Sequence, residues 1–337
     1  MVSLGIDVII PMYNAAGHIE ECLDHVFASE YQNFLVTVVD DQSSDDSLAR
    51  VGRYPKTKLL ALDKNMGAST ARNRGVAETT GGIVVFIDSD VLIPKGFLAR
   101  VAEFFTTRPE VAAIQGRYED RPYYKNLFSQ YKHFVFSFRG VNPSQHGEQY
   151  VDYVHTACVA VRRKVFSEVV FNEQLSRCED IDFGQRCTLA GYKIFADPTL
   201  AVSHKKKYTF LSYTMYQFRA ARDMVLNSLS KRSANAQITY YSKKSPLYKK
   251  LWLMRPLVGF AFLFALVVVV MKGYDFAWLL LALLIVASFV FEVPFRVYLL
   301  KNAPIWISIA AWPLYFLDGI TTGMGVIQGV LTFRRPE

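Results

Sequence analysis

Short apolar runs alternate with amphipathic segments over the first two hundred residues. The run 6–11 is β-branched and stops at a proline, as is typical of a buried parallel strand. The next segment, 14–29, puts Ile19, Cys22 and Val26 on one helical face. Further strands are predicted at 34–39, 59–62, 83–87, 111–115, 156–161 and 192–196. Further helices are predicted at 47–54, 67–79, 97–107, 118–138, 166–170 and 179–190. This alternation predicts a three-layer α/β domain with a mostly parallel sheet and right-handed crossovers.

The apolar residues are concentrated near the C-terminus. No charged residue occurs in 256–271 or in 276–291, and Asp318 is the only one in 303–333. A bilayer span needs about 20 apolar residues. The first run reaches that length only if 251–254 is included, with the Arg255 side chain extending toward the membrane surface.

Two to three transmembrane helices are therefore predicted over 251–333. The third run contains Pro313 and four glycines (319, 323, 325 and 329), so it is either a tilted helix or a broken, re-entrant one. The number of spans decides on which side of the membrane Arg334 and Arg335 lie.

The net charge of +8 comes from one part of the chain. Between Lys205 and Arg255 there are twelve Lys or Arg residues and one acid, Asp223. Such a segment suits a solvated helix face, a nucleic acid or an anionic lipid surface. Its position beside the apolar runs favours the lipid surface and argues against nucleic acid.

The sequence thus divides into an α/β domain (1–207), basic amphipathic juxtamembrane helices (208–250) and membrane helices (251–333). The N-terminus has no basic region and no cleavage site of a signal peptide. We therefore expect a multi-pass protein of the cytoplasmic membrane whose α/β domain is cytoplasmic, and self-association into a homo-oligomer stays open.

Acidic residues follow two of the predicted strands. Asp40 and Asp41 follow 34–39, and Asp88 and Asp90 follow 83–87. Ligands of parallel sheets collect at the carboxyl ends of the strands. Two carboxylates at alternating positions can share one Mg²⁺ or Mn²⁺ ion, although acids at strand ends are also common turn residues.

Five motifs in this order resemble the family-2 glycosyltransferases of GT-A fold, over about residues 5–205. They are Val8-Ile-Ile-Pro-Met-Tyr-Asn14, Val38-Val-Asp-Asp-Gln-Ser-Ser-Asp45, Asn65-Met-Gly-Ala-Ser-Thr-Ala-Arg-Asn-Arg-Gly75, Phe86-Ile-Asp-Ser-Asp90, and Cys178-Glu179-Asp180 with the residues up to Tyr192. The resemblance implies an inverting transfer of a sugar from a nucleotide-diphosphate donor, such as a UDP- or GDP-sugar.

The resemblance also implies roles for individual residues. The donor-binding residues would be Pro11, Tyr13, Asn14, Asp41, Arg72 and Asp88. Asp88 and Asp90 would hold the metal ion. Asp180, next to Glu179, would be the catalytic base, because an inverting transfer needs a carboxylate to accept the proton of the acceptor hydroxyl. The same pair also suits the start of a helix, and the two roles are compatible.

Two further candidates stand near the basic segment. In some relatives a histidine near this point binds the metal or the diphosphate, so His204 either has that role or is a surface histidine that precedes three lysines. Processive relatives carry a Gln-x-x-Arg-Trp motif, and Gln217-Phe-Arg-Ala-Ala-Arg222 departs from it because it has no Trp. The departure argues against a processive polymerase and leaves Arg222 as a candidate contact of the diphosphate.

The acceptor is predicted to be a hydroxyl of a lipid or lipid-linked glycan at the membrane. The alternative is a polyprenyl phosphate as nucleophile, but Asp90-Val-Leu-Ile-Pro94 departs from the run typical of that subclass. Two other classes stay open, a nucleotidyltransferase and an inactive membrane scaffold. The first normally carries a Gly-rich signature where Pro11-Met-Tyr-Asn14 stands here, and the second has no reason to keep the complete set of acids.

Overall fold

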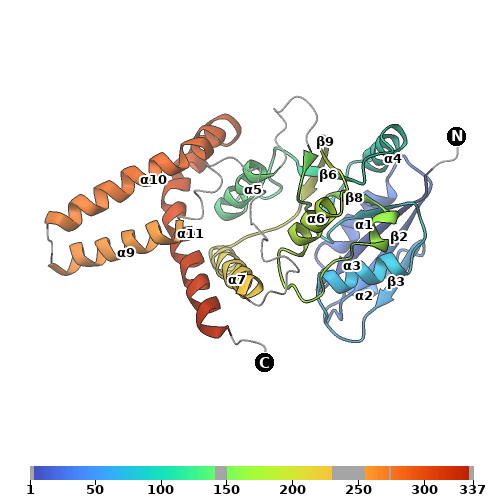
Figure 1. Ribbon diagram of the computed structural model, residues 1–337, viewed down its shortest axis with the longest axis horizontal. Coiled ribbons are helices and arrows are strands. Elements are labelled where there is room, and N and C mark those ends of the chain that lie inside the picture. Colours follow the sequence, from blue (N-terminus) through green and yellow to red (C-terminus); the bar gives the residue numbers. More distant parts are fainter. Residues whose placement is uncertain (1–3, 141–149, 230–254, 273–274, 334–337) are drawn as a thin grey trace. The chain divides into compact units, whose positions relative to one another are not determined.

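The computed structural model describes residues 4–140, 150–229, 255–272 and 275–333. The chain forms two compact units. The first is Met1–Tyr123 with Gly140–Lys206, and the second is Tyr124–Arg139 with Lys207–Glu337 (Figure 1). The basic positions 231–250 and the C-terminal Arg334 and Arg335 lie outside the described residues.

The first unit is built on a sheet. Its strands are β1 (Ile6–Met12), β2 (Phe34–Asp40), β3 (Thr57–Ala61), β4 (Ile83–Phe86), β5 (Val91–Leu92), β6 (Ala113–Tyr118), β7 (Tyr150–Val151), β8 (Val159–Arg162) and β9 (Ile194–His204). Within the described residues they follow the order β3-β2-β1-β4-β8-β6-β9-β5, and β7 pairs with β9. The half from β3 to β4 is parallel, whereas β8 runs antiparallel between β4 and β6.

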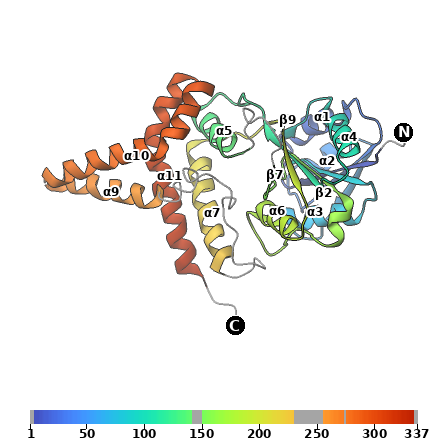
Figure 2. The ribbon, with the colours of Figure 1, turned by 45° about the horizontal axis from the view of Figure 1, so that its top comes forward.

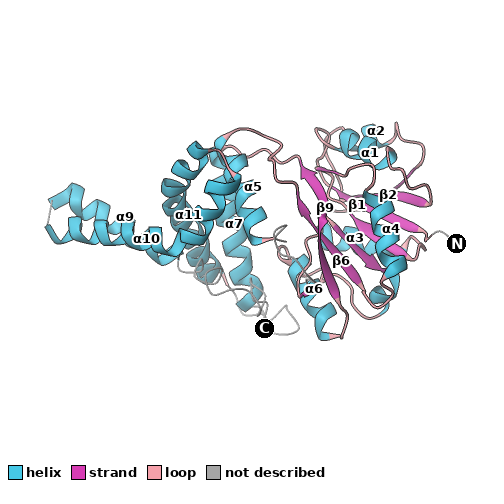
Figure 3. Ribbon diagram, turned by 90° about the horizontal axis from the view of Figure 1, so that it is seen from above, coloured by secondary structure: helices cyan, strands magenta, loops and turns pink. Residues whose placement is uncertain are grey.

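Helices cover both faces of this sheet, as Figures 2 and 3 show. They are α1 (Ile19–Phe27), α2 (Ser47–Val51), α3 (Ala68–Ala77), α4 (Phe97–Thr107) and α6 (Glu179–Leu189), with a 3₁₀ turn at Arg163–Ser167. Val8 of β1 belongs to the core with α1 and α4, and its neighbour Ile9 belongs to the core with α3 and α6. Successive strand residues point to opposite faces, so the predicted three-layer α/β architecture is confirmed.

The short helix predicted at 166–170 is instead the 3₁₀ turn at Arg163–Ser167, and two longer elements also differ from the sequence prediction. The helix predicted from 118 begins only at Leu127, after Pro122, because Pro disfavours a helical residue before it and the Asn126 side chain accepts the Ser129 amide at 2.9 Å. The strand predicted at 192–196 continues to His204. A register shift against β6 accommodates the proline at 198, whose carbonyl oxygen accepts a hydrogen bond from Arg117.

The second unit is helical. In the part of it that the structure describes, its helices are α5 (Leu127–Arg139), α7 (Phe210–Leu229), α9 (Arg255–Lys272), α10 (Asp275–Asn302) and α11 (Ile305–Thr332). The sequence division had placed α5 within 1–207. It belongs to the second unit because its aromatic face packs there, with the ring of Tyr131 6.1 Å from those of Tyr213 and Phe295.

Helix α11 packs so closely against α9 and α7 that glycines of α11 lie directly against their backbones. A Cβ atom on Gly319 would lie 2.4 Å from the carbonyl oxygen of Arg255 in α9, and one on Gly325 would lie 2.2 Å from that of Phe218 in α7. Small residues permit such close packing of helices. The predicted alternative of a broken helix is wrong, because α11 continues as a single helix through Pro313.

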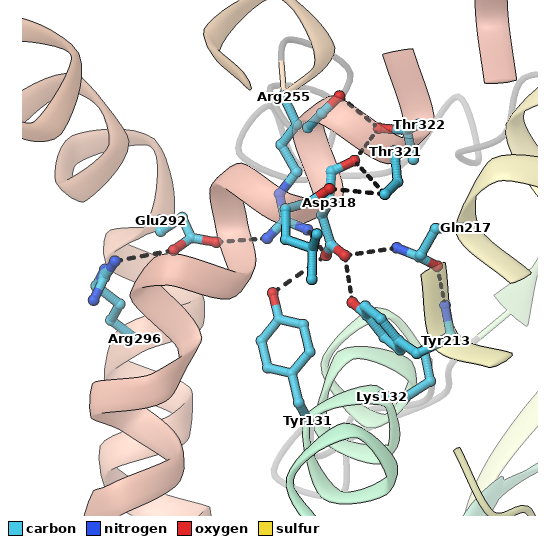
Figure 4. A network of polar contacts seen from close by, with 12 residues as sticks. Tyr131, Lys132, Tyr213, Gln217, Arg255, Glu292, Arg296, Asp318, Thr321 and Thr322 are labelled. Atoms are coloured by element: carbon cyan, nitrogen blue, oxygen red, sulfur yellow. Dashed lines mark hydrogen bonds and ion pairs between the residues drawn. The ribbon is translucent and has the colours of Figure 1, made fainter. Parts of the chain in front are cut away.

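A buried carboxylate connects these helices (Figure 4). Asp318 of α11 is 1% exposed and accepts hydrogen bonds from the hydroxyls of Tyr131 and Tyr213 and from the amide of Gln217. Asp318 also forms an ion pair with the Arg255 guanidinium at 3.0 Å. One side chain of α11 thereby contacts α5, α7 and α9.

The network continues from α9 into α10. Arg255 also pairs with Glu292 at 2.5 Å, and the second oxygen of Glu292 lies 3.1 Å from Arg296 (Figure 4). Two acids and two arginines thus neutralise one another inside the helical unit, as buried charges require.

The length and apolar composition of the helices indicate which of them could cross a bilayer. Within the described residues, α11 alone is a single helix long and apolar enough to cross a bilayer. The segments Ala277–Ser288 and Glu292–Asn302 qualify together but bend by 58° between them, and Arg255–Met271 is shorter. The prediction of two to three spans therefore stays a prediction.

Candidate active site

Arg72 joins two of the acidic motifs. It lies on α3, is 3% exposed, and donates to Asp88 at 3.0 Å and to Glu179 at 2.8 Å. Asp88 follows β4, and Glu179 opens α6. One guanidinium therefore brings together the carboxyl end of a parallel strand and the amino end of a distant helix.

The charges of this cluster depend on one another. Burial alone would lower the pKa of Arg72, but Asp88 and Glu179 outweigh it and raise that pKa. Burial and the neighbouring Asp180 raise the pKa of Glu179, against the attraction of Arg72. A buried arginine that faces two acids stays charged and holds them in a fixed geometry.

Asp180 is the second residue of α6. Its Oδ1 accepts the Ile181 amide at 2.8 Å, and its Oδ2 lies 3.6 Å from Nδ1 of His155. Burial would raise the pKa of Asp180, but the contact with His155 and the charge of Arg72 outweigh burial, so the pKa is lowered. The carboxylate is therefore ionised near neutral pH, as a proton acceptor must be.

Asp90 and His204 lie next to each other because β5 pairs with β9. Val91 is opposite His204, and the His204 Nε2 lies 3.3 Å from the Asp90 carboxylate. Lys206 lies 3.2 Å from the second oxygen, and the His204 ring stacks on Tyr118. Burial opposes the charge of Asp90, yet the contacts with His204 and Lys206 hold the pKa of Asp90 well below the usual range.

Asp41 organises a loop. Its two carboxylate oxygens accept the backbone amides of Met66 and Gly67 at 2.6 and 2.8 Å, and its own amide donates to Met12. Gly67 has φ of +89°, a conformation that favours glycine, and it directly precedes α3. Asp41 thereby fixes the start of the helix that carries Arg72.

The turn after β1 is bound to the turn after β2. Asn14 accepts the Ser44 amide at 2.8 Å and donates its own amide to Ser43 at 2.9 Å. The neighbouring Tyr13 is 53% exposed, and Pro11 is half-buried at the end of β1. Tyr13 is thus available for stacking, whereas Asn14 already has polar partners within the protein.

The remaining candidate, Arg222, lies in the second unit on α7. It pairs with its neighbour Asp223 at 2.7 Å. Its predicted contact with the diphosphate stays a prediction.

Sequence reasoning missed three polar residues of the first unit: His18, His155 and Lys206. Burial lowers the pKa of His18, against the opposing charge of Asp90. Single histidines in loops carry no spacing that marks them, and Lys206 was noted only as one of a basic run. Their places follow from the sheet topology and not from a local pattern.

A metal ion was predicted at Asp88, Asp90 and His204. Within the described residues, no group of three or more His, Cys, Asp or Glu side chains is arranged to hold a metal ion. Asp90 and His204 are adjacent, while one oxygen of Asp88 is bonded to Arg72. Asp90 and His204 alone make a partial site.

In open α/β sheets such as this one, ligands bind outside the carboxyl ends of the strands, where these carboxylates lie. Residues 7–170 match the family model of Glycosyl transferase family 2. The first unit thus carries a glycosyltransferase domain of this family, with a GT-A-like fold.

Individual relatives support this assignment. The amylovoran biosynthesis glycosyltransferase AmsB of Erwinia amylovora is 28% identical over 210 residues, which cover 57% of this chain and 67% of AmsB. The putative teichuronic acid biosynthesis glycosyltransferase TuaG of Bacillus subtilis is 32% identical over 107 residues, 31% of this chain and 42% of TuaG.

One solved structure is similar over nearly the whole chain. The mannosyltransferase PcManGT from Pyrobaculum calidifontis, solved in complex with GDP-Man and Mn²⁺, has a TM-score of 0.60 at 20% identity, and the match covers 98% of this chain and 87% of PcManGT. At this identity the similarity concerns the fold.

Proposed function

We propose that this protein is a membrane-anchored, metal-dependent, inverting glycosyltransferase. It transfers a sugar from a nucleotide-diphosphate donor to a hydroxyl of a lipid or lipid-linked glycan at the cytoplasmic face of the membrane. The observation that carries the proposal is the contact of Arg72 with both Asp88 and Glu179. It joins the motif assigned to the donor with the motif assigned to the base.

The donor side is supported by the nature of the side chains. Two carboxylates and one imidazole fit a hard divalent cation, since such ions take only one or two protein carboxylates and complete their shell with phosphate and water. Asp88, Asp90 and His204 would hold Mg²⁺ or Mn²⁺, which when bound would stabilise the charge of the leaving diphosphate. PcManGT, which has a similar fold, was solved with this kind of donor and metal.

The acceptor side rests on Asp180. The acceptor oxygen attacks the anomeric carbon, the bond from that carbon to the diphosphate oxygen breaks, and its electron pair leaves with the diphosphate. The hydroxyl proton passes to the ionised Asp180 carboxylate. One displacement inverts the configuration at the anomeric carbon.

The lipid-linked acceptor is supported by the second unit. Helix α11 is long and apolar enough to cross a bilayer, and the twelve basic residues between 205 and 255 precede the apolar helices. The names of AmsB and TuaG describe polysaccharide biosynthesis, which suggests that the product here is also a surface or wall glycan.

The proposal is tested with the purified full chain in detergent. UDP- and GDP-sugars are screened by thermal shift with and without Mn²⁺, and the lipid products of the best donor are identified by mass spectrometry. We expect one donor to stabilise the protein only with metal, and Asp90→Ala to lose that shift. A shift from nucleoside triphosphates alone would indicate a nucleotidyltransferase, and a sugar attached to a lipid phosphate would indicate the polyprenyl-phosphate alternative.

A further inference from the structure

His155 lies beside the carboxylate to which we assign the proton transfer. Its Nδ1 is 3.6 Å from Oδ2 of Asp180, and its side chain is 40% exposed. The other oxygen of Asp180 is bonded to the Ile181 amide. The imidazole therefore faces the oxygen of Asp180 that the helix backbone leaves open.

The position of His155 is determined by the protein framework. The amide of His155 donates to the side chain of Gln115 at 2.5 Å, and Gln115 is 1% exposed on β6. The Gln115 side chain also donates to the carbonyl oxygen of Cys158 at 3.1 Å. The Cys158 backbone amide in turn donates to the carbonyl oxygen of His155 at 3.0 Å. This closed turn anchors the histidine to the central sheet.

We propose that His155 is a positioning residue for Asp180, which rests on the proposed role of Asp180 as the base. Nδ1–H of the imidazole would donate to Oδ2 and orient the carboxylate, so that a remaining lone pair of Oδ2 accepts the proton of the acceptor hydroxyl. The 3.6 Å separation is longer than a hydrogen bond, and such contacts often shorten only when the substrates are bound. No described protein group bonds Nε2 of His155.

The groups around Asp180 allow us to predict how the loss of the His155 imidazole changes the pH dependence of the reaction. Asp180 faces His155 and Arg72, with Glu179 adjacent in sequence, and the His155 ring lies 5.2 Å from that of Tyr153. The contact with His155 lowers the pKa of Asp180. Removing the imidazole raises that pKa, so the acid limb of the kcat/KM profile moves to higher pH.

Three variants of the full chain separate the alternatives: His155→Ala, His155→Asn and His155→Gln. The amide nitrogen of Asn lies near the position of Nδ1, whereas that of Gln lies near Nε2. We expect Ala and Gln to lower kcat by about tenfold or more, with donor KM nearly unchanged. Mutating a group that orients a functional side chain typically lowers activity ~10–100-fold. Asn should recover most of the loss. GDP-mannose with Mn²⁺, the donor and metal in the PcManGT structure of similar fold, is the combination to try first.

Two results would overturn the proposal. One is a His155→Ala variant whose kcat and acid limb match the wild type. The other is an Asn variant no better than Gln, and this comparison holds even if Ala misfolds. Asp180→Asn keeps this test apart from that of the proposed function: if Asp180→Asn retains turnover, the base assignment fails. If it is inactive while His155→Ala is normal, only the positioning role fails.

Discussion

At the scale of single residues, the site depends on one planar cation. Arg72 presents donors in a fork, and two of them reach carboxylates from separate elements. Replacing it affects the folded state and the reaction together, because Asp88 belongs to the predicted donor site and Glu179 neighbours the predicted base.

Arg72→Lys tests this directly. A single ammonium cannot replace both hydrogen bonds of the fork, so we expect a loss of roughly 1–3 kcal/mol in the free energy of unfolding and about a 100-fold fall in turnover. Arg74→Lys on the same helix is the matched control, since Arg74 is largely exposed and pairs only with Glu78 in the described structure. Equal melting temperatures and turnover in both variants would contradict the role of Arg72.

Single residues also show which parts of the candidate site could be predicted from the sequence and which could not. The positions of Asp88, Asp90 and Glu179 follow from motifs at strand and helix ends, which local patterning makes visible. The contact of Arg72 with two acids, and that of His155 with Asp180, depend on crossovers that bring distant segments together. No periodicity or spacing encodes them.

At the scale of elements, the helical unit is held by both close packing and charge. Gly319 and Gly325 let α9 and α7 approach α11, and Asp318 bonds to groups from three other helices. The sequence showed Asp318 as the only charge in a long apolar run, but its partners were not predictable. They come from α5, which is inserted in the sequence of the catalytic unit, and from α7 and α9.

Asp318→Ala tests this arrangement. Removing the carboxylate leaves the buried Arg255 with one acid fewer and two tyrosine hydroxyls without their acceptor. We expect a cost of about 3 kcal/mol, measured as a lower melting temperature of the full chain in detergent. Asp275→Asn, at an exposed helix start, should cost only a few tenths. Comparable melting of the two variants would exclude a stabilising role for the network.

At the scale of the whole molecule, the chain passes from one unit to the other three times, after residues 123, 139 and 206. The catalytic unit thus carries α5, whose core face belongs to the helical unit, within its own sequence. The sequence division at 207 could not detect this, because an aromatic helix can equally cover a sheet.

A chain shortened to residues 1–206 should therefore aggregate. It would keep α5 but lose α7, α10 and α11, leaving Tyr131, Phe134 and Val135 without their packing partners. The same chain with these three residues changed to Ser should stay in solution, as measured by light scattering. If the unaltered short chain is monodisperse, the assignment of α5 to the helical unit is wrong.

The central claim is that the joined acids carry out glycosyl transfer with Asp180 as the base. The most direct measurement compares wild type and Asp180→Asn for product formation and for donor binding in the same metal-containing buffer. We predict that Asp180→Asn binds the donor within a fewfold of wild type but loses transfer by at least about 1,000-fold. Near-normal transfer by Asp180→Asn would contradict the account.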